Sequence, residues 1–412
     1  MDGEIEQPLQ EQPLPALSIE AGENPAQDLL KSESDRPGTF YQTVMSVIAA
    51  FIVVAFSGYK DMKPLYSTTG HNKAHLRNLL IAGCFFIIVT FLCAVVLMMF
   101  VLRHGQRGRR TCSVLIILVG VTGTMLIVSD TLLVVVMNRS NVLLSAVLAP
   151  ELVLVIVAAS AGAWFVEVEQ PGSTTGSRYH TAMKGTFDVA AMGTMASFTL
   201  QGTVGFGYLK SPEGKRDPPL DLAVCYLTST FCLSAMMICA MPMSLLPGNM
   251  LENLARCIER LRHAALAALA LMTLVVSVEF LDGFAVLSFC PEAIALVLHY
   301  AVEFFSARPR RGENLPFLDL GFRTVAGVSF TLMAGLYAAF LGTDHYSVYL
   351  KAAMSVLLMA VLSSLSRLAM LPEMGGAVEI GIAGVVLAFP AAALLAACPL
   401  VLKVVLELYQ NR

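Results

Sequence analysis

The residues most able to do chemistry in this sequence are a few ionisable side chains inside long apolar runs. A charge at the centre of a membrane helix costs on the order of 2.5 to 3.5 kcal/mol, so each needs a reason to be there. We expect Asp282 at a helix end and Glu303 near an interface, where that cost is small. The remaining candidates for a pathway or binding site are Asp130, Glu151, Glu279, Glu292 and His299.

Two of these carboxylates directly follow a proline, as Pro150-Glu151 and Pro291-Glu292. A proline inside a helix removes one backbone hydrogen bond and kinks the helix. Glu292 and His299 are seven residues apart, so one helix face can carry both. One interpretation is a path for protons or cations, because carboxylates in a low dielectric can exchange protons near neutral pH. The other is structural, with each glutamate hydrogen-bonded to a carbonyl freed by the proline or to a neighbouring helix.

Two further pairs of opposite charge are predicted to be structural. Lys184 and Asp188 are four residues apart, and so are Asp319 and Arg323. Side chains at this spacing meet on the surface of a helix, so each pair can neutralise itself along its own helix. Substrate binding is the alternative.

Signals of other chemistry are missing from the sequence. It contains no G-x-x-x-x-G-K-[ST], H-E-x-x-H or G-x-S-x-G, so we expect no enzyme and assign no catalytic residue. Most of the nine cysteines lie in apolar segments and none forms C-x-x-C, which favours packing over a metal site, and no cofactor is predicted. The basic residues lie in short loops without interleaved aromatic residues, so nucleic acid binding has no support.

The elements that must position these residues are predicted to be membrane helices. Hydrophobic residues make up 56% of the chain and charged residues only 14%, outside the range of soluble globular proteins. A span needs roughly 20 apolar residues, and the runs of that length are 41–59, 79–102, 112–137, 142–167, 183–208, 220–246, 262–281, 283–306, 318–342 and 347–371. The last apolar segment contains Pro390 and Pro399, so it forms either one long helix or two short ones.

An internal repeat favours two helices in that last segment. "SFTL" occurs at 197–200 and again at 329–332, and "APELVL", "CPEAIAL" and "CPLVL" place Pro150, Pro291 and Pro399 at corresponding positions. The prediction is an all-α integral membrane protein with eleven or twelve spans, twelve preferred. Three parallel four-helix units would cover 40–170, 180–306 and 317–412, the third with three or four helices.

The first 39 residues differ from the rest, with nine acidic side chains, five prolines and no aromatic residue. Such a segment cannot bury enough apolar surface to fold, so a disordered acidic tail is predicted. In the twelve-span arrangement fifteen Lys and Arg residues lie on the N-terminal side and eight on the other, which favours a cytosolic N-terminus.

The function predicted first is a carrier or channel for a small solute or ion, with buried carboxylates on kinked helices and the lipid bilayer as the other partner. The alternative is a non-transporting scaffold or regulatory protein that acts through its tail and cytosolic loops. The substrate, the membrane and the oligomeric state do not follow from the sequence.

Overall fold

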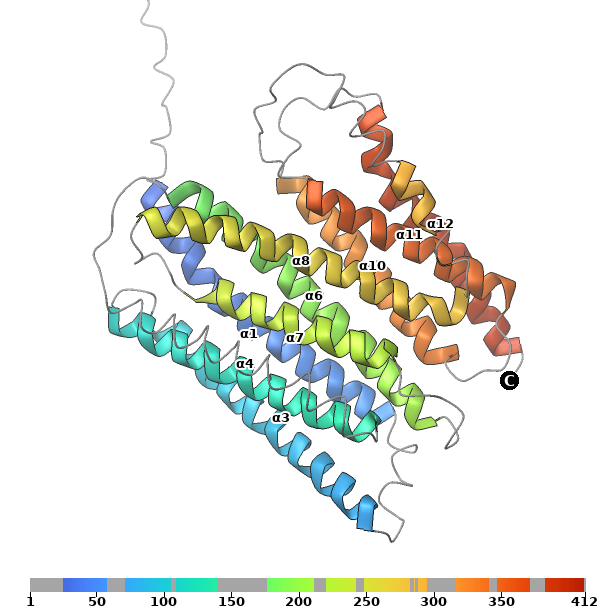
Figure 1. Ribbon diagram of the computed structural model, residues 1–412, viewed down its shortest axis with the longest axis horizontal. Helices are drawn as coiled ribbons and strands as arrows, with labels where there is room; N and C mark the ends of the chain where they lie inside the picture. Colours follow the sequence, from blue (N-terminus) through green and yellow to red (C-terminus); the bar gives the residue numbers. More distant parts are fainter. Residues whose placement is uncertain are drawn as a thin grey trace, which may run out of the picture.

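The computed structural model describes residues 25–57, 71–104, 109–138, 176–210, 220–241, 248–281, 285, 288–294, 316–340, 347–370 and 382–410. These residues form long α-helices that lie side by side, and they contain no strand (Figure 1). The helices are α1 (Pro25–Ser57), α3 (His71–His104), α4 (Arg109–Asn138), α6 (Gly176–Lys210), α7 (Leu220–Ala240), α8 (Gly248–Leu281), α10 (Pro316–Phe340), α11 (Val348–Met370) and α12 (Ile382–Gln410).

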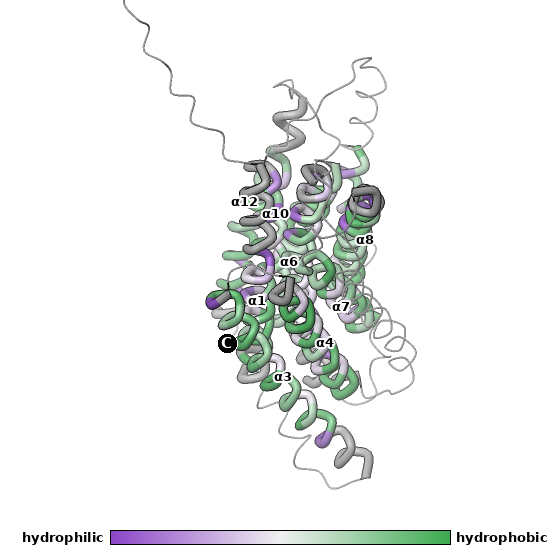
Figure 2. Tube along the Cα trace, turned by 90° about the vertical axis from the view of Figure 1, so that its left-hand side faces the viewer, coloured by the Kyte–Doolittle hydropathy of each residue, from purple (hydrophilic) through white to green (hydrophobic). Residues whose placement is uncertain are grey.

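Seven segments in the described helices are long and apolar enough to cross a bilayer. They are Arg77–Arg103, Ser113–Val136, Leu220–Ala240, Leu254–Val278, Asp319–Phe340, Val348–Met370 and Ala388–Glu407. Figure 2 shows that apolar residues predominate along the helices. A helix satisfies its backbone hydrogen bonds internally, so such segments can lie in lipid without exposing unpaired peptide groups. The chain is therefore a multi-pass integral membrane protein.

The helices differ in how much of their surface other helices cover. Only 17% of the apolar segment of α3 and 22% of that of α12 is buried, against 67% for α7. The exposed residues of α3 and α12 include Phe85, Ile88 and Leu395, which suit contact with lipid. α3 and α12 therefore lie at the periphery and α7 at the centre.

α6 contributes to two hydrophobic clusters through different faces. Phe187 and Phe198 pack in a cluster with α1, α4 and α7, whereas Val189 and Leu200 pack in a cluster with α8, α10 and α11. Gly193 permits close packing on α7, because a Cβ there would lie 2.7 Å from the Cys232 sulfur. α6 thus packs in both clusters, as α7 does through Cys232 in one and Met236 in the other.

The C-terminal segment differs from the preferred prediction. Ile382–Gln410 is one continuous helix that includes Pro390 and Pro399, so no separate helix starts near residue 391. A proline removes only one hydrogen bond, and membrane helices tolerate this loss where the freed groups find other partners. Residues 317–412 accordingly contribute three described helices, α10, α11 and α12. The count of twelve spans and the threefold repeat are not confirmed.

The N-terminal boundary also differs. α1 begins at Pro25 and includes Pro37, so part of the predicted disordered tail is helical. Phe40 and Val44 are fully buried. Their packing stabilises α1, and the acidic composition of the segment before them does not indicate this contact. Residues 1–24, the predicted span 142–167 and most of 283–306 lie outside the described residues.

Candidate functional site

Asp130 lies at the junction of three helices and is fully buried. From α6, Gln201 Nε2 donates a hydrogen bond to Asp130 Oδ1 at 2.6 Å. From α7, Ser229 Oγ lies 3.4 Å from Asp130 Oδ2 and 2.8 Å from Gln201 Oε1. Asp130, Gln201 and Ser229, here called the Asp130 centre, thus connect α4, α6 and α7 through a carboxylate and two neutral side chains.

The surroundings of the Asp130 centre are also polar on the side of α7. Ser229 Oγ lies 2.8 Å from the carbonyl oxygen of Tyr226, and the Tyr226 hydroxyl contacts Thr131 Oγ1 at 2.9 Å. The thiol of Cys225 is close enough to interact electrostatically with Asp130. The sequence prediction included Asp130 but missed Gln201 and Ser229. An amide inside an apolar helix is a usable signal, because burying it is costly without a hydrogen-bond partner.

A second buried carboxylate, Asp221, lies in the first turn of α7. Tyr337, near the end of α10, donates a hydrogen bond from its hydroxyl to Asp221 Oδ2 at 2.7 Å. Asp221 Oδ1 accepts from the backbone N–H of Leu222 at 2.9 Å, and the negative charge suits the N-terminal end of a helix. The ring of Tyr337 packs edge-to-face on Phe280 of α8 with centroids 5.1 Å apart. This contact ties the end of α10 to the start of α7.

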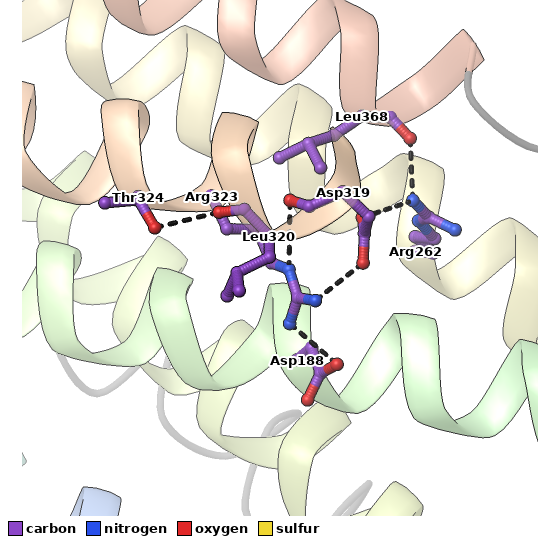
Figure 3. Close-up of polar contacts among 7 residues, drawn as sticks. All are labelled: Asp188, Arg262, Asp319, Leu320, Arg323, Thr324 and Leu368. Atoms are coloured by element: carbon purple, nitrogen blue, oxygen red, sulfur yellow. Dashed lines mark hydrogen bonds and ion pairs between the residues drawn. The ribbon is translucent and has the colours of Figure 1, made fainter. Parts of the chain in front are cut away.

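The start of α10 carries a cluster of opposite charges (Figure 3). Arg323 binds two carboxylates, with 2.6 Å from Nη1 to Asp188 Oδ2 and 2.6 Å from Nη2 to Asp319 Oδ2. The pair Asp319 and Arg323 lies within one helix, at the predicted spacing of four. Asp188 makes an ion pair across the interface with Arg323 of α10. The exposed Lys184, which the sequence analysis paired with Asp188 along α6, interacts with Asp188 electrostatically.

Arg262 of α8 completes this cluster. Its Nη2 donates to the carbonyl oxygen of Leu368 at 2.8 Å and lies 3.6 Å from Asp319 Oδ1. Gly185 leaves room for the guanidinium, because a Cβ there would lie 3.0 Å from Arg262 Nη1. Asp188, Arg262, Asp319 and Arg323, here called the interface ion cluster, join α6, α8 and α10 to the end of α11 with balanced charge.

Glu292 is paired with α11. Its Oε1 accepts hydrogen bonds from Ser366 Oγ and from Arg367 Nη1, the latter at 2.6 Å. Arg367 is only 1% exposed and Glu292 only 6%, so this is a deeply buried ion pair. The contact matches the structural interpretation of Glu292, a bond to a neighbouring helix.

Pro291 falls in the first turn of the described α-helical stretch 290–294, which follows the 3₁₀ residues 288–289. The rest of the predicted span 283–306, on which the kink prediction depends, lies mostly outside the described residues. A proline in a first turn costs no helical hydrogen bond, because the N–H groups there have no partner within the helix. Pro399 lies inside α12 and is exposed.

The other predicted site residues are not placed. Glu151, Pro150 and His299 lie outside the described residues, and Glu279 belongs to α8 but its side chain lies outside them too. Among the described residues, no group of three or more His, Cys, Asp or Glu side chains could hold a metal ion.

The described residues therefore form four polar centres inside a helical membrane bundle: the Asp130 centre, the Asp221–Tyr337 contact, the interface ion cluster and the Glu292–Arg367 pair. Comparison of the chain with protein-family models, with curated proteins and with solved structures finds no match to any of them.

Proposed function

We propose that the protein is a membrane carrier for a small solute or ion, in which α10 forms the movable boundary between two groups of helices. The observation that carries this proposal is that polar contacts fasten α10 at both of its ends. Near its start Arg323 binds Asp188 of α6, and near its end Tyr337 binds Asp221 of α7. We call these the two end contacts of α10.

The end contacts lie at opposite ends of a helix long enough to cross the bilayer. Between them, α10 presents buried apolar or small side chains such as Ala326, Phe330 and Met333 to the cluster with α6, α8 and α11. Apolar packing is not directional, whereas an ion pair or a charged hydrogen bond is lost when its atoms separate. An interface of this kind can open at one end while the other end stays closed, which is the motion a carrier needs.

The Asp130 centre gives this proposal a second support. A fully buried carboxylate that bonds to two other helices is expensive to keep inside a membrane bundle, and such residues commonly mark ion or substrate pathways. A scaffold that acts through its loops has no need of it.

The test is flux through the purified full-length protein in proteoliposomes, with protons, Na⁺, K⁺ and a panel of small metabolites offered in turn. We expect the wild type to move at least one of them. Arg323→Gln and Tyr337→Phe, which each weaken one end contact, should change the rate by about one to two orders of magnitude, since a hydrogen bond to a charged group contributes about 1.5 to 3 kcal/mol.

The matched control is Lys184→Gln, because Lys184 is exposed and near Asp188 without forming its ion pair. Its flux should equal that of the wild type. A folded wild-type protein that moves none of the panel, or end-contact variants with unchanged flux, would overturn the proposal.

A further inference from the structure

We infer that the guanidinium of Arg36, near the membrane end of α1, binds a phosphate group at the surface of the bilayer. The phosphate belongs to a lipid headgroup or to a soluble anion, since both offer the same oxygen atoms. This site goes beyond the proposed carrier and does not depend on it. Three features of Arg36 support it: its burial, the donors that it leaves without a partner, and its depth relative to the bilayer.

Arg36 is a buried cation whose charge the described residues do not balance. The residue is only 5% exposed. Cys239 of α7 is close enough to interact with it electrostatically, but a cysteine offers no carboxylate. In the part of the chain that the structure describes, no carboxylate forms an ion pair with Arg36. Because burying a charge without a counter-charge is costly, an anion from outside the chain would stabilise this arrangement.

The donors of Arg36 have the geometry that a phosphate requires. Its Nε and Nη2 atoms are both buried and have no hydrogen-bond partner among the described residues. These two atoms share one edge of the planar guanidinium, and their N–H bonds on that edge point in parallel. Such an edge holds two oxygen atoms of one phosphate, which a single point charge does not do. Arg36 therefore presents a two-donor edge that no described group of the protein occupies.

Arg36 lies at the depth of the lipid headgroups. It precedes Tyr41, where the apolar run 41–59 begins, by five residues, or about 7 Å along a helix. The headgroup layer is about 5 to 7 Å thick on each side of the hydrocarbon core. Cys239 indicates the same depth, because the apolar segment of α7 ends one residue later, at Ala240. Every phospholipid carries its phosphate in this layer, so phosphate is favoured over a carboxylate as the anion.

Packed helices hold Arg36 at this place. One turn further along α1, Phe40 is fully buried in a cluster that also contains Cys239 of α7 and Ala255 of α8. Figure 1 shows the starts of α1, α6 and α8 at the same end of the bundle. The guanidinium is thus fixed beside the end of α7, which lowers the entropy that binding an anion would cost.

The test is native mass spectrometry of the purified full-length protein in detergent, titrated with phosphatidic acid or with diacylglycerol. These two lipids differ only in the phosphate. We expect the wild type to bind phosphatidic acid more tightly than diacylglycerol. Arg36→Gln should weaken the binding of phosphatidic acid about tenfold or more, because two charge-assisted hydrogen bonds are lost. The binding of diacylglycerol should stay unchanged.

Two further variants separate the two-donor edge from charge in general. Arg260→Gln is the matched control, because Arg260 is exposed near the start of α8, and its affinity should equal that of the wild type. Arg36→Lys keeps the positive charge but lacks the two-donor edge, so its affinity should lie between those of the wild type and Arg36→Gln. If Arg36→Gln does not fold, Arg36→Lys decides the question.

Inorganic phosphate, offered alone, tests the soluble source. If it binds here, it should raise the thermal unfolding midpoint of the wild type more than that of Arg36→Gln. A response that depends on Arg36 with phosphatidic acid alone identifies a lipid headgroup, and one with inorganic phosphate alone identifies a soluble anion. The site is overturned if neither response depends on Arg36, or if Arg36→Lys responds as the wild type does.

Discussion

Two buried carboxylates of this bundle differ in the partners that the structure describes for them. Glu292 accepts hydrogen bonds from the guanidinium of Arg367 and from the hydroxyl of Ser366, so a full positive charge lies beside it. Asp130 is bonded to an amide and lies near a hydroxyl, both of which are neutral. Both residues are charges in apolar runs of the sequence, and only the structure shows that Glu292 lies beside a guanidinium whereas Asp130 bonds to an amide.

The difference has an energetic consequence. A guanidinium keeps its charge at any physiological pH, so loss of the carboxylate beside it leaves an uncompensated buried ion. An amide and a hydroxyl can each act as donor or acceptor, so they can accommodate a neutral side chain in place of the carboxylate. Substitutions that remove the charge should therefore lower the free energy of unfolding more at Glu292 than at Asp130.

The largest effect is expected for Glu292→Gln. It should lower the free energy of unfolding by about 3 to 5 kcal/mol, because Arg367 stays buried without its carboxylate. Thermal unfolding of the detergent-solubilised protein measures the change. The double variant Glu292→Leu with Arg367→Met is the control and should regain most of the loss, since an apolar pair can replace a buried ion pair. If the Glu292→Gln variant is as stable as the wild type, the ion pair between Glu292 and Arg367 does not form in the folded protein.

A smaller loss, about 2 kcal/mol, is expected for Arg323→Gln. Without the guanidinium, the carboxylates of Asp188 and Asp319 face each other without the cation that binds both. The loss stays below that of Glu292→Gln because the side chains of the ion cluster are about one-fifth exposed, with Arg323 at 19%. Lys184→Gln, measured in the same assay, should change stability by less than about 0.5 kcal/mol. Equal effects of the two variants would contradict the pairing of Asp188 with α10.

For Tyr337→Phe we expect a loss of about 1.5 kcal/mol. Only the hydroxyl that donates to Asp221 is removed, and the ring contact with Phe280 remains. Tyr349→Phe is the matched control, because Tyr349 is exposed and should be nearly neutral. The midpoint of thermal unfolding of both variants gives the comparison, and similar midpoints would argue against the end contact at Asp221.

The smallest effect is expected for Asp130→Asn, within about 1 kcal/mol of the wild type. Asparagine has the shape of aspartate and can bond to Gln201 and Ser229, so only the charge is lost. The same thermal unfolding assay applies. A loss as large as that of Glu292→Gln would erase the distinction between the two carboxylates.

This ordering differs from one of the two interpretations that the sequence left open, in which Glu292, next to a proline in an apolar run, belonged to a path for protons or cations. The pairing with Arg367 makes Glu292→Gln a substitution in a structural ion pair. Asp130→Asn takes its place as the probe of function.

Several helices follow from the sequence with little error. The runs predicted at 79–102, 112–137, 318–342 and 347–371 correspond to α3, α4, α10 and α11. They are predictable because length and apolar composition decide whether a segment can cross a bilayer. The split of α12 near Pro390 was wrong because the cost of a proline depends on whether surrounding groups satisfy the freed backbone, which composition does not report.

The candidate site residues could also be predicted from the sequence only in part. Asp130 and Glu292 stand out in the sequence as charges in apolar runs, but their partners do not. Gln201 is 71 residues from Asp130, and Arg367 is 75 residues from Glu292. No spacing rule for a single helix connects positions so far apart, so the correct pairs could not be chosen.

The sequence by itself determined that this chain is an integral membrane protein, that it is helical, and that a few carboxylates lie within apolar helices, where a charge is costly. These properties are local, because roughly 20 consecutive residues decide whether a segment forms an apolar helix. The tertiary structure decided that Glu292 faces a guanidinium, that Asp188 binds α10, and that Asp130 bonds to an amide beside a hydroxyl. The packing of helices distant in sequence sets those partners, and the partner decides how much stability is lost when a buried carboxylate loses its charge.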